Sequence, residues 1–163
     1  MTSGHTAWGP AAAGPVASSD LATLYLRHRE AMVRLARLLT GSMAVAEEVV
    51  QEAFLRMHQR GTPPDNPAGY LRTTVANISK SHMRRLRLER RMPAAERVSF
   101  DDPVIDETWA AVRRLPFRQR AVLALRFYED LPEAEIARLL GCRIGTVKSS
   151  LHRGLAKLRD ELT

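Results

Sequence analysis

LPEAEIARLLGCRIGTVKSSLHRGLAKLRDEL, residues 131–162, predicts two helices joined by a tight turn. The first helix is short, and its apolar residues recur at helical spacing. These residues are Ile136, Leu139 and Leu140. Gly141 follows, at the position where a residue in the left-handed conformation usually ends a helix. The second helix is expected to begin near Gly145 or Thr146 and to have one apolar face. That face contains Val147, Leu151, Leu155, Leu158 and Leu162.

The other face of the second predicted helix is polar and basic. It carries Lys148, Ser149, His152 and Arg153, with Arg143 and Thr146 at the entry to the helix. A DNA major groove admits one α-helix, whose exposed donors near its N-terminus reach base edges and phosphates. The stretch therefore predicts a helix-turn-helix DNA-binding motif. The alternative is an amphipathic hairpin with a basic solvent face. The short first helix, the glycine turn and the basic face together favour DNA binding.

Composition and charge narrow the class of protein. The chain of 163 residues has room for one domain or two small ones, and the absence of clear strand patterns predicts an all-α fold. Lysine and arginine number 25 against 18 acidic residues, so the net charge of +7 favours a polyanionic partner, nucleic acid before membrane. The single cysteine, Cys142, excludes an internal disulfide and fits a reducing compartment.

Several classes of function find no support in the sequence. It contains no apolar run of membrane-spanning length and no signal-peptide pattern at its N-terminus, so we expect a cytoplasmic protein without a membrane partner. The five histidines are scattered without ligand spacing, and no nucleophile triad or phosphate-binding glycine loop is present. We therefore predict no metal, no cofactor and no enzymatic activity.

The helical pattern divides the chain into two units. Residues 1–18 are rich in Gly, Ala, Pro and Ser and predict a disordered tail that includes Trp8. Residues 19–91 predict three helices, near 20–39, 44–60 and 68–91, with Ser42 and Asn66 as N-caps. Residues 92–106 predict a linker, and residues 107–163 a second unit with Trp109 and Phe127 in its core. The expected architecture is two small helical domains joined by a flexible linker.

Two surfaces of the first unit stand out. One face of its second helix carries Glu48, Gln51, Glu52 and Leu55, at the spacing i, i+3, i+4 and i+7. This face suits a basic helix of another protein, although periodicity alone favours a solvated face. The third helix ends in a basic run, for which phosphate contact is the stronger interpretation. The run contains Lys80, Arg84, Arg85, Arg87, Arg90 and Arg91.

Three segments together resemble an extracytoplasmic-function sigma factor of bacterial RNA polymerase. AEEVVQEAFLR, residues 46–56, is similar to the helix with which the family binds core polymerase. GYLRTTVAN, residues 69–77, is similar to the segment that melts and reads the minus-ten element. LPFRQRAVLALRFYEDLPEAEIARLLGCRIGTVKSSLHRGLAKL, residues 115–158, is similar to the domain that reads the minus-thirty-five element. The resemblance covers nearly all of residues 22–162.

The resemblance implies three sets of site residues. Glu48, Gln51, Glu52 and Leu55 would meet the clamp of the polymerase β′ subunit. The minus-ten strand would contact Tyr70, Arg72, Asn77, Lys80, Arg84 and Arg85, with Tyr70 as a stacking platform and Asn77 at a flipped base. The minus-thirty-five duplex would contact Arg143, Thr146, Lys148, Ser149, His152 and Arg153.

The chain departs from the family's pattern at three positions. Tyr70 stands where relatives commonly have Trp, so we expect stacking with altered strength or base preference. Ser150 replaces a residue that is usually basic, which predicts one lost phosphate contact and weaker DNA binding. Gly154 stands where relatives often have Ala, and glycine within a helix costs about 1 kcal/mol.

The resemblance implies a dissociable initiation factor that binds core RNA polymerase, through the β′ clamp and the β flap, and promoter DNA. An anti-sigma factor would be a further partner of such a protein. Two other interpretations stay open. An ordinary helix-turn-helix regulator would bind duplex DNA without polymerase, but it leaves the helix at residues 46–56 unexplained. A protein–protein adaptor made of helical hairpins leaves the charge pattern unexplained.

Overall fold

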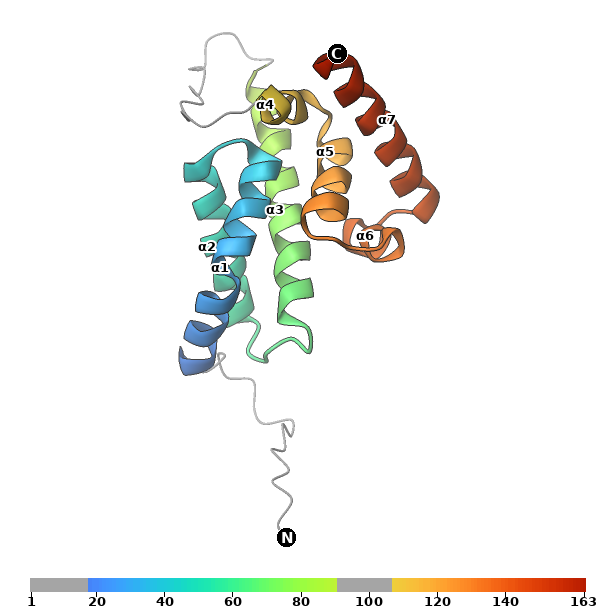
Figure 1. Ribbon diagram of the computed structural model, residues 1–163. Coiled ribbons are helices and arrows are strands. Elements are labelled where there is room, and N and C mark those ends of the chain that lie inside the picture. The colour runs from blue at the N-terminus through green and yellow to red at the C-terminus, as the bar shows by residue number, and fades with distance from the viewer. Residues whose placement is uncertain (1–17, 91–106) are drawn as a thin grey trace.

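The computed structural model describes residues 18–90 and 107–163, and all regular elements within those ranges are helical (Figure 1). They are α1 (Ser18–Thr40), α2 (Met43–Gln59), α3 (Pro67–Glu89), α4 (Glu107–Arg114), α5 (Phe117–Leu123), the π-helix η1 (Ala124–Tyr128), α6 (Glu133–Leu140) and α7 (Ile144–Leu162). The all-α prediction is confirmed. The predicted tail up to residue 17, with Trp8, and the predicted linker lie outside the described residues, as does the side chain of Trp109.

The N-terminal unit, helices α1 to α3, is a bundle around one apolar core. Its fully buried residues recur at helical spacing on all three helices, because each amphipathic helix turns its apolar stripe inward. They include Met32, Leu35, Leu39, Val50, Met57, Leu71 and Val75. The boundaries follow local chemistry as predicted. Gly41 after α1 has φ +78°, the Ser42 hydroxyl accepts from the Val45 N–H, and the Asn66 side chain accepts from the Gly69 N–H.

The C-terminal unit, helices α4 to α7, contains the predicted helix-turn-helix. Helix α6 ends at Gly141, whose φ of +62° is left-handed, and α7 begins three residues later at Ile144. The buried residues of this unit include Val122, Leu125, Ile136 and Val147. No helix in the described ranges is long and apolar enough to cross a lipid bilayer.

A π-helical turn changes the expected core of the C-terminal unit. Phe127 was predicted to be buried, but 64% of it is exposed. The Glu129 N–H donates to the Ala124 carbonyl, so the turn is wider than that of an α-helix. Together with Leu123 and Ala124, Phe127 lines an apolar groove that is open to solvent. The prediction that Phe127 is buried is therefore wrong.

The two units pack against each other, with α5 and α6 beside α3 (Figure 1). Arg72 Nε on α3 donates to Glu129 Oε2 after η1 at 2.8 Å. The Arg34 guanidinium on α1 lies 5.9 Å from the centre of the Tyr128 ring. The buried residues of both units therefore form one contact network. The sequence predicted the units but not their contact.

Candidate nucleic-acid and protein interfaces

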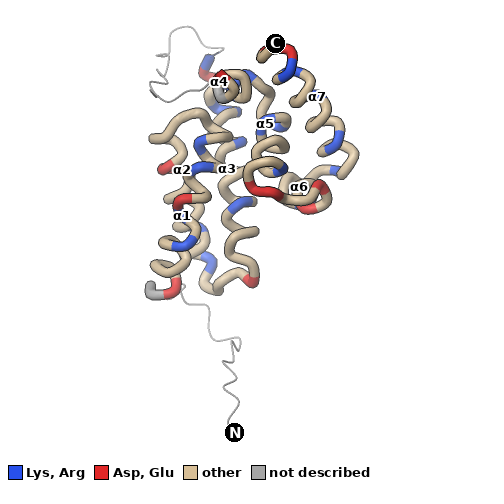
Figure 2. The backbone as a smooth tube through the Cα atoms, viewed as in Figure 1, with Lys and Arg blue, Asp and Glu red and all other residues tan. Residues whose placement is uncertain are grey.

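Helix α7 presents the predicted duplex-reading residues to solvent. Arg143, Lys148, His152 and Arg153 are exposed, while Thr146 and Ser149 are half-buried. The Ser149 hydroxyl donates to the Thr146 carbonyl at 3.1 Å, and Lys148 Nζ lies 4.0 Å from Glu133 Oε2. Lysine and arginine residues occur at several positions along both α3 and α7 (Figure 2). The cations of α7 are therefore accessible to phosphates and base edges. The Glu133 carboxylate of α6 lies at the edge of this basic surface.

The buried side of α7 corrects the expectation for Ser150. Only 6% of Ser150 is exposed, so a side chain at this position faces the helices beneath and not a DNA backbone. This burial argues against a phosphate contact at position 150, and the predicted weaker DNA binding stays a prediction.

Gly154 lies at a close contact between α7 and α5. A Cβ atom added at Gly154 would lie 3.0 Å from Leu123 Cδ1, so the glycine permits close approach of α7 and α5.

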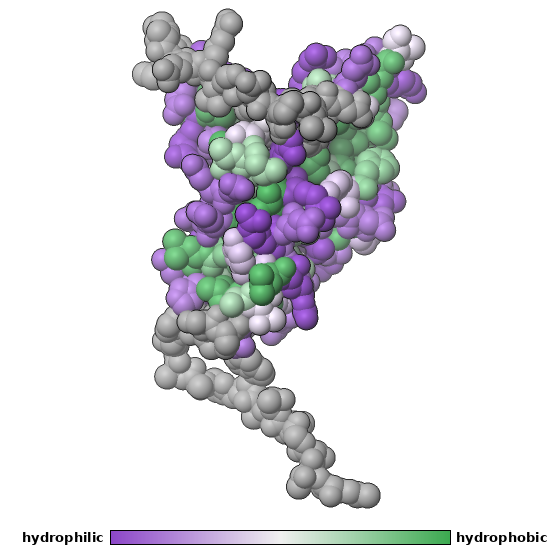
Figure 3. Space-filling model, turned by 60° about the vertical axis from the view of Figure 1, so that its left-hand side comes forward, coloured by the Kyte–Doolittle hydropathy of each residue, from purple (hydrophilic) through white to green (hydrophobic). Residues whose placement is uncertain are grey.

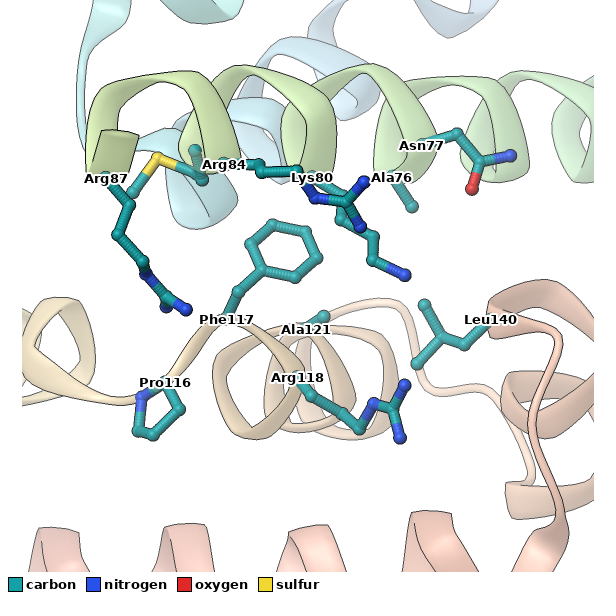
Figure 4. Close-up of a pocket in the computed structure, with 11 residues that line it drawn as sticks. Ala76, Asn77, Lys80, Arg84, Arg87, Pro116, Phe117, Arg118, Ala121 and Leu140 are labelled. Carbon is teal, nitrogen blue, oxygen red and sulfur yellow. The ribbon is translucent and has the colours of Figure 1, made fainter. Parts of the chain in front are cut away.

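Helix α3 carries the predicted strand-reading residues along one side. Asn77, Lys80 and Arg84 are exposed and line a cavity of about 300 Å³ between the two units. Figure 4 shows Lys80 and Arg84 on the α3 side of this cavity, with the Phe117 ring of α5 projecting into it from the other side. Tyr70 lies near the N-terminus of α3, and the Arg60 guanidinium is 5.5 Å from the centre of its ring. An aromatic ring, an amide and two cations on one helix provide stacking and backbone contacts for a single strand.

Two other residues predicted to contact the minus-ten DNA strand lie at different positions around the axis of α3. Arg72 lies roughly 140° around the α3 axis from Asn77, given about 100° per residue, and pairs with Glu129. Arg85 is exposed and lies about 100° from its neighbour Arg84 but only about 60° from Tyr70. The structure thus brings Tyr70, Asn77, Lys80 and Arg84 to one side of α3, places Arg85 at the edge of that side and separates Arg72 from them.

Helix α2 exposes the predicted polymerase-binding face. Glu48 and Gln51 are exposed, and Leu55 keeps 48% of its surface in solvent. Glu52 Oε1 accepts from Arg56 Nε at 2.8 Å. Glu48 is also close enough to α3 to raise the pKa of His82, against the larger lowering by burial and by Arg85. An exposed leucine at the end of a face with two carboxylates is available for docking.

The sequence did not reveal an apolar groove that both units line. Its volume is about 280 Å³, and hydrophobic surface also gathers in a hollow at the upper right of Figure 3. The groove residues are Leu38, Val112, Leu123, Ala124, Phe127, Tyr128, Leu155 and Leu158. Leu155 was predicted on the apolar face of α7. The sequence did not predict that part of this face is exposed to solvent.

Arg120 was also missed, because arginine is rarely buried. Only 4% of it is exposed, and its guanidinium donates to the Arg113 carbonyl at 3.0 Å and lies 5.7 Å from the Phe117 ring centre. Burial, and then the charge of Arg113, lower the pKa of Arg120 to about 10. It stays protonated at neutral pH and ties the end of α4 to α5.

Comparison with known proteins finds two family models in this chain. Sigma-70 region 2 matches residues 24–89, and Sigma-70 region 4 matches residues 105–158. The chain is 35% identical over 151 residues to the RNA polymerase sigma-E factor of Streptomyces avermitilis, which covers 85% of this chain and 83% of that protein. It is 32% identical over 154 residues to the ECF RNA polymerase sigma factor SigE of Mycolicibacterium smegmatis, and spans 60% of the length of that protein.

Solved structures show the same fold. The sigma factor RpoE of Bartonella quintana, crystallised with the anti-sigma factor NepR, matches 88% of this chain and 97% of its own with a TM-score of 0.70 at 22% identity. CnrH, solved with the cytosolic domain of CnrY, matches with a TM-score of 0.64, also at 22% identity, over 88% of each chain.

Proposed function

The chain belongs to the extracytoplasmic-function group of the sigma-70 family of RNA polymerase sigma factors, and we propose that it directs core polymerase to specific promoters. The observation that carries this proposal is the order of three surfaces along one chain. The acidic α2 face is followed by the strand-reading side of α3 and then by the duplex-reading face of α7. A free repressor would need only the last of them.

The C-terminal unit would read the minus-thirty-five element. Its α7 helix would enter the major groove, with Lys148, Ser149 and Arg153 near base edges and phosphates. Arg143 and Thr146 at the entry would contact the backbone, and His152 would face the same groove. Phosphate contacts would give the affinity its salt dependence.

The N-terminal unit would capture the unpaired minus-ten strand. Tyr70 would stack on a base, Asn77 would hold an extruded base, and Lys80 and Arg84 would neutralise phosphates. Arg85 would add a further phosphate contact. Arg72 would join them only if its side chain left Glu129, with which it pairs in this structure.

Two surfaces would hold the polymerase. Glu48, Gln51, Glu52 and Leu55 on α2 would dock on the β′ clamp, where carboxylates suit a basic helix. The apolar groove beside α7 would receive an apolar element of the β flap, because a concave hydrophobic groove fits an amphipathic helix. Catalysis would belong to the polymerase, so the chain itself would not be an enzyme. It would act in the cytoplasm, and an anti-sigma factor would regulate it by covering these surfaces.

The test is promoter-dependent transcription with purified core polymerase. We expect the chain to co-elute with core polymerase and to give new start sites on a library of genomic fragments. Glu48→Lys reverses a charge on the α2 face, so the affinity of the chain for core polymerase should fall at least tenfold. Glu30→Lys makes the same charge change at an exposed position of α1 and should leave the affinity for core polymerase unchanged.

Other outcomes of these experiments would favour one of the two alternative interpretations. Specific duplex binding by the free chain, together with no binding to core polymerase, would replace the sigma proposal with an ordinary regulator. Binding to neither DNA nor polymerase would favour the adaptor interpretation. An equal loss from both charge reversals would remove the assignment of the α2 face.

A further inference from the structure

Arginine side chains gather where the end of α3 meets α4 and the start of α5. Two adjoining cavities of about 340 Å³ each lie there. The arginines that line both cavities are Arg90, Arg113, Arg114 and Arg120. Arg87 lines one of them, and its side chain extends from the end of α3 toward the start of α5 in Figure 4. No aspartate or glutamate is among the described lining residues of either cavity.

Arg120 is the buried member of this cluster. Only 4% of its surface is exposed, and its Nη1 donates to the Arg113 carbonyl at 3.0 Å. Its Nε–H is also buried, but it has no hydrogen-bond partner among the described residues. A buried donor without a partner is unfavourable, because it has lost its contact with water without gaining another. Arg120 therefore brings a charged, unpaired donor to the wall that both cavities share.

Two arginines at the end of α3 add exposed charge to the same place. Both Arg87 and Arg90 are exposed, and neither has an ion-pair partner within the described ranges. Arg114 differs from them, since its Nη1 lies 2.9 Å from Glu161 Oε2 and part of its charge is already balanced. The positive charge that is least compensated is therefore that of Arg87, Arg90 and Arg120.

The electrostatics of Arg120 favour an anion beside it. Burial, and then the charge of Arg113, lower the pKa of Arg120, so its positive charge is poorly stabilised by its surroundings. A bound anion would offset both causes. The planar guanidinium of arginine matches the oxygens of a phosphate group, to which it donates two parallel hydrogen bonds. The chemistry of the cluster is therefore that of a phosphate site.

We infer that these two cavities bind a small anion with two or more linked phosphate groups. Their volumes are at the lower end of pockets that hold small molecules. Two linked phosphates match two adjoining cavities with common arginines, whereas a single phosphate would reach only part of the cluster. None of the residues assigned above to the minus-ten strand, to the minus-thirty-five duplex or to the polymerase lines either cavity. The site therefore goes beyond the proposed function.

Linked phosphates occur both in inorganic polyphosphates and in nucleoside di- and triphosphates. One of the two cavities has an apolar wall beside the arginines, which provides a surface for a nucleobase. This wall consists of Leu86, Leu115, Pro116 and Phe117. The shared chemistry is the row of phosphates, and the two sources are distinguished by experiment.

Isothermal titration calorimetry of the full chain with sodium tripolyphosphate tests the site. We expect one saturable site, and a rise in the midpoint temperature of thermal unfolding, because a ligand that binds only the folded state stabilises it. Sodium sulfate at the same ionic strength is the control for screening of charges. Titration with ATP and GTP identifies the source. Tighter binding of either nucleotide than of tripolyphosphate assigns the apolar wall to a nucleobase, and equal or weaker binding assigns the site to an inorganic chain.

The decisive variants are Arg87→Gln and Arg90→Gln, which remove exposed charges and leave the buried core intact. Each should weaken the binding of tripolyphosphate about tenfold, the loss expected for one charge-assisted hydrogen bond. Arg27→Gln is the matched control. It makes the same charge change at an exposed position of α1 that lines neither cavity, so the affinity should stay that of the wild type.

Nuclear magnetic resonance gives a direct readout at the buried member of the cluster. The Nε–H signal of Arg120 can be assigned through its own side-chain carbons in the wild-type chain, without a substitution in the core. Tripolyphosphate should shift this signal in proportion to the occupancy measured by calorimetry. The Nε–H signal of Arg27 should stay in place.

Three results would overturn the site. One is the absence of saturation at millimolar tripolyphosphate. Another is equal affinity of the wild type, Arg87→Gln, Arg90→Gln and Arg27→Gln, which would indicate a general attraction by net charge. The third is a loss of single-stranded DNA binding in Arg87→Gln and Arg90→Gln with unchanged binding of tripolyphosphate, which would assign these arginines to the DNA backbone. None of these results depends on promoter-dependent transcription, so the site and the proposed function can fail separately.

Discussion

Ser150 and Gly154 show how a single residue is interpreted differently once its neighbours are known. Both lie on the buried side of α7, although the sequence had suggested a missing phosphate contact at one and a weak helix position at the other. Helical periodicity predicted the apolar stripe of α7, yet it could not tell how far burial extends to the polar positions beside that stripe. Arg120 was missed for a related reason. A sequence does not show that a buried arginine will donate a hydrogen bond to a backbone carbonyl, as Arg120 does to Arg113.

The burial of Ser150 gives a prediction at the residue scale. Ser150→Arg would insert a large cation between α7 and the helices beneath it, so the free energy of unfolding should fall by about 2 kcal/mol or more. Chemical denaturation checks this value, with Lys157→Arg on the exposed side of α7 as the control. Tighter promoter binding by Ser150→Arg with unchanged stability would contradict the burial and restore the phosphate-contact interpretation.

At the scale of elements, local chemistry predicted several helix ends. Ser42, Asn66 and Gly141 occupy the positions that their side chains or backbone freedom had indicated, because caps act within one turn of the chain. The π-helical turn η1 was not predicted. Its wider turn depends on the packing of the helices around it, and the apolar pattern of residues 122–127 fits an ordinary α-helix equally well.

Two glycines in the helix-turn-helix provide a matched test of this local chemistry. Gly141→Ala should lower the free energy of unfolding by about 1 kcal/mol, because its φ of +62° is strained for a residue with a Cβ. Gly145→Ala should leave stability unchanged or raise it slightly, since Gly145 lies in the first turn of α7 with open space around it. Equal effects in urea denaturation would show that backbone conformation does not distinguish the two positions.

At the scale of the whole molecule, the sequence predicted two helical units and their surfaces but not the contact between them. Charged residues such as Arg72 and Glu129 are expected at a solvent surface, and 57 positions separate them along the chain. Patterns of local spacing contain no information about such a pairing. Of the residues predicted for the minus-ten strand, Tyr70, Asn77, Lys80 and Arg84 lie on one side of α3, whereas Arg72 does not.

Stability of the whole fold should fall in mild acid because of two histidines. Burial lowers the pKa of His28 and of His82 below 6.5, helped by Arg27 and Arg72 at the first and by Arg85 at the second. The unfolded chain therefore binds more protons in this range, so stability is lost as the pH falls from 6.5 through the folded pKa values. Glu48 and Glu89 oppose the shift at His82 but do not reverse it.

Thermal unfolding between about pH 7.5 and about pH 5 measures this loss. The midpoint temperature of the wild type should drop more steeply than that of the double variant His28→Gln, His82→Gln, which has no imidazole at these two sites. His152→Gln, at an exposed position on α7, serves as the control and should follow the wild type. Parallel curves for wild type and double variant would assign the acid sensitivity to other groups.

The π-helical turn at Ala124–Tyr128 makes the number of residues in this part of the chain more important than their identity. Helices α6 and α7 follow the turn, so their direction depends on the residue count before them. Removing one residue there would rotate everything downstream by about 100° relative to α4 and α5. Replacing exposed Phe127 would change the lining of the apolar groove but not the direction of α6 and α7. The exposed positions of the segment should therefore accept substitutions more readily during evolution than the segment accepts insertions and deletions, whereas buried Leu125 should stay apolar.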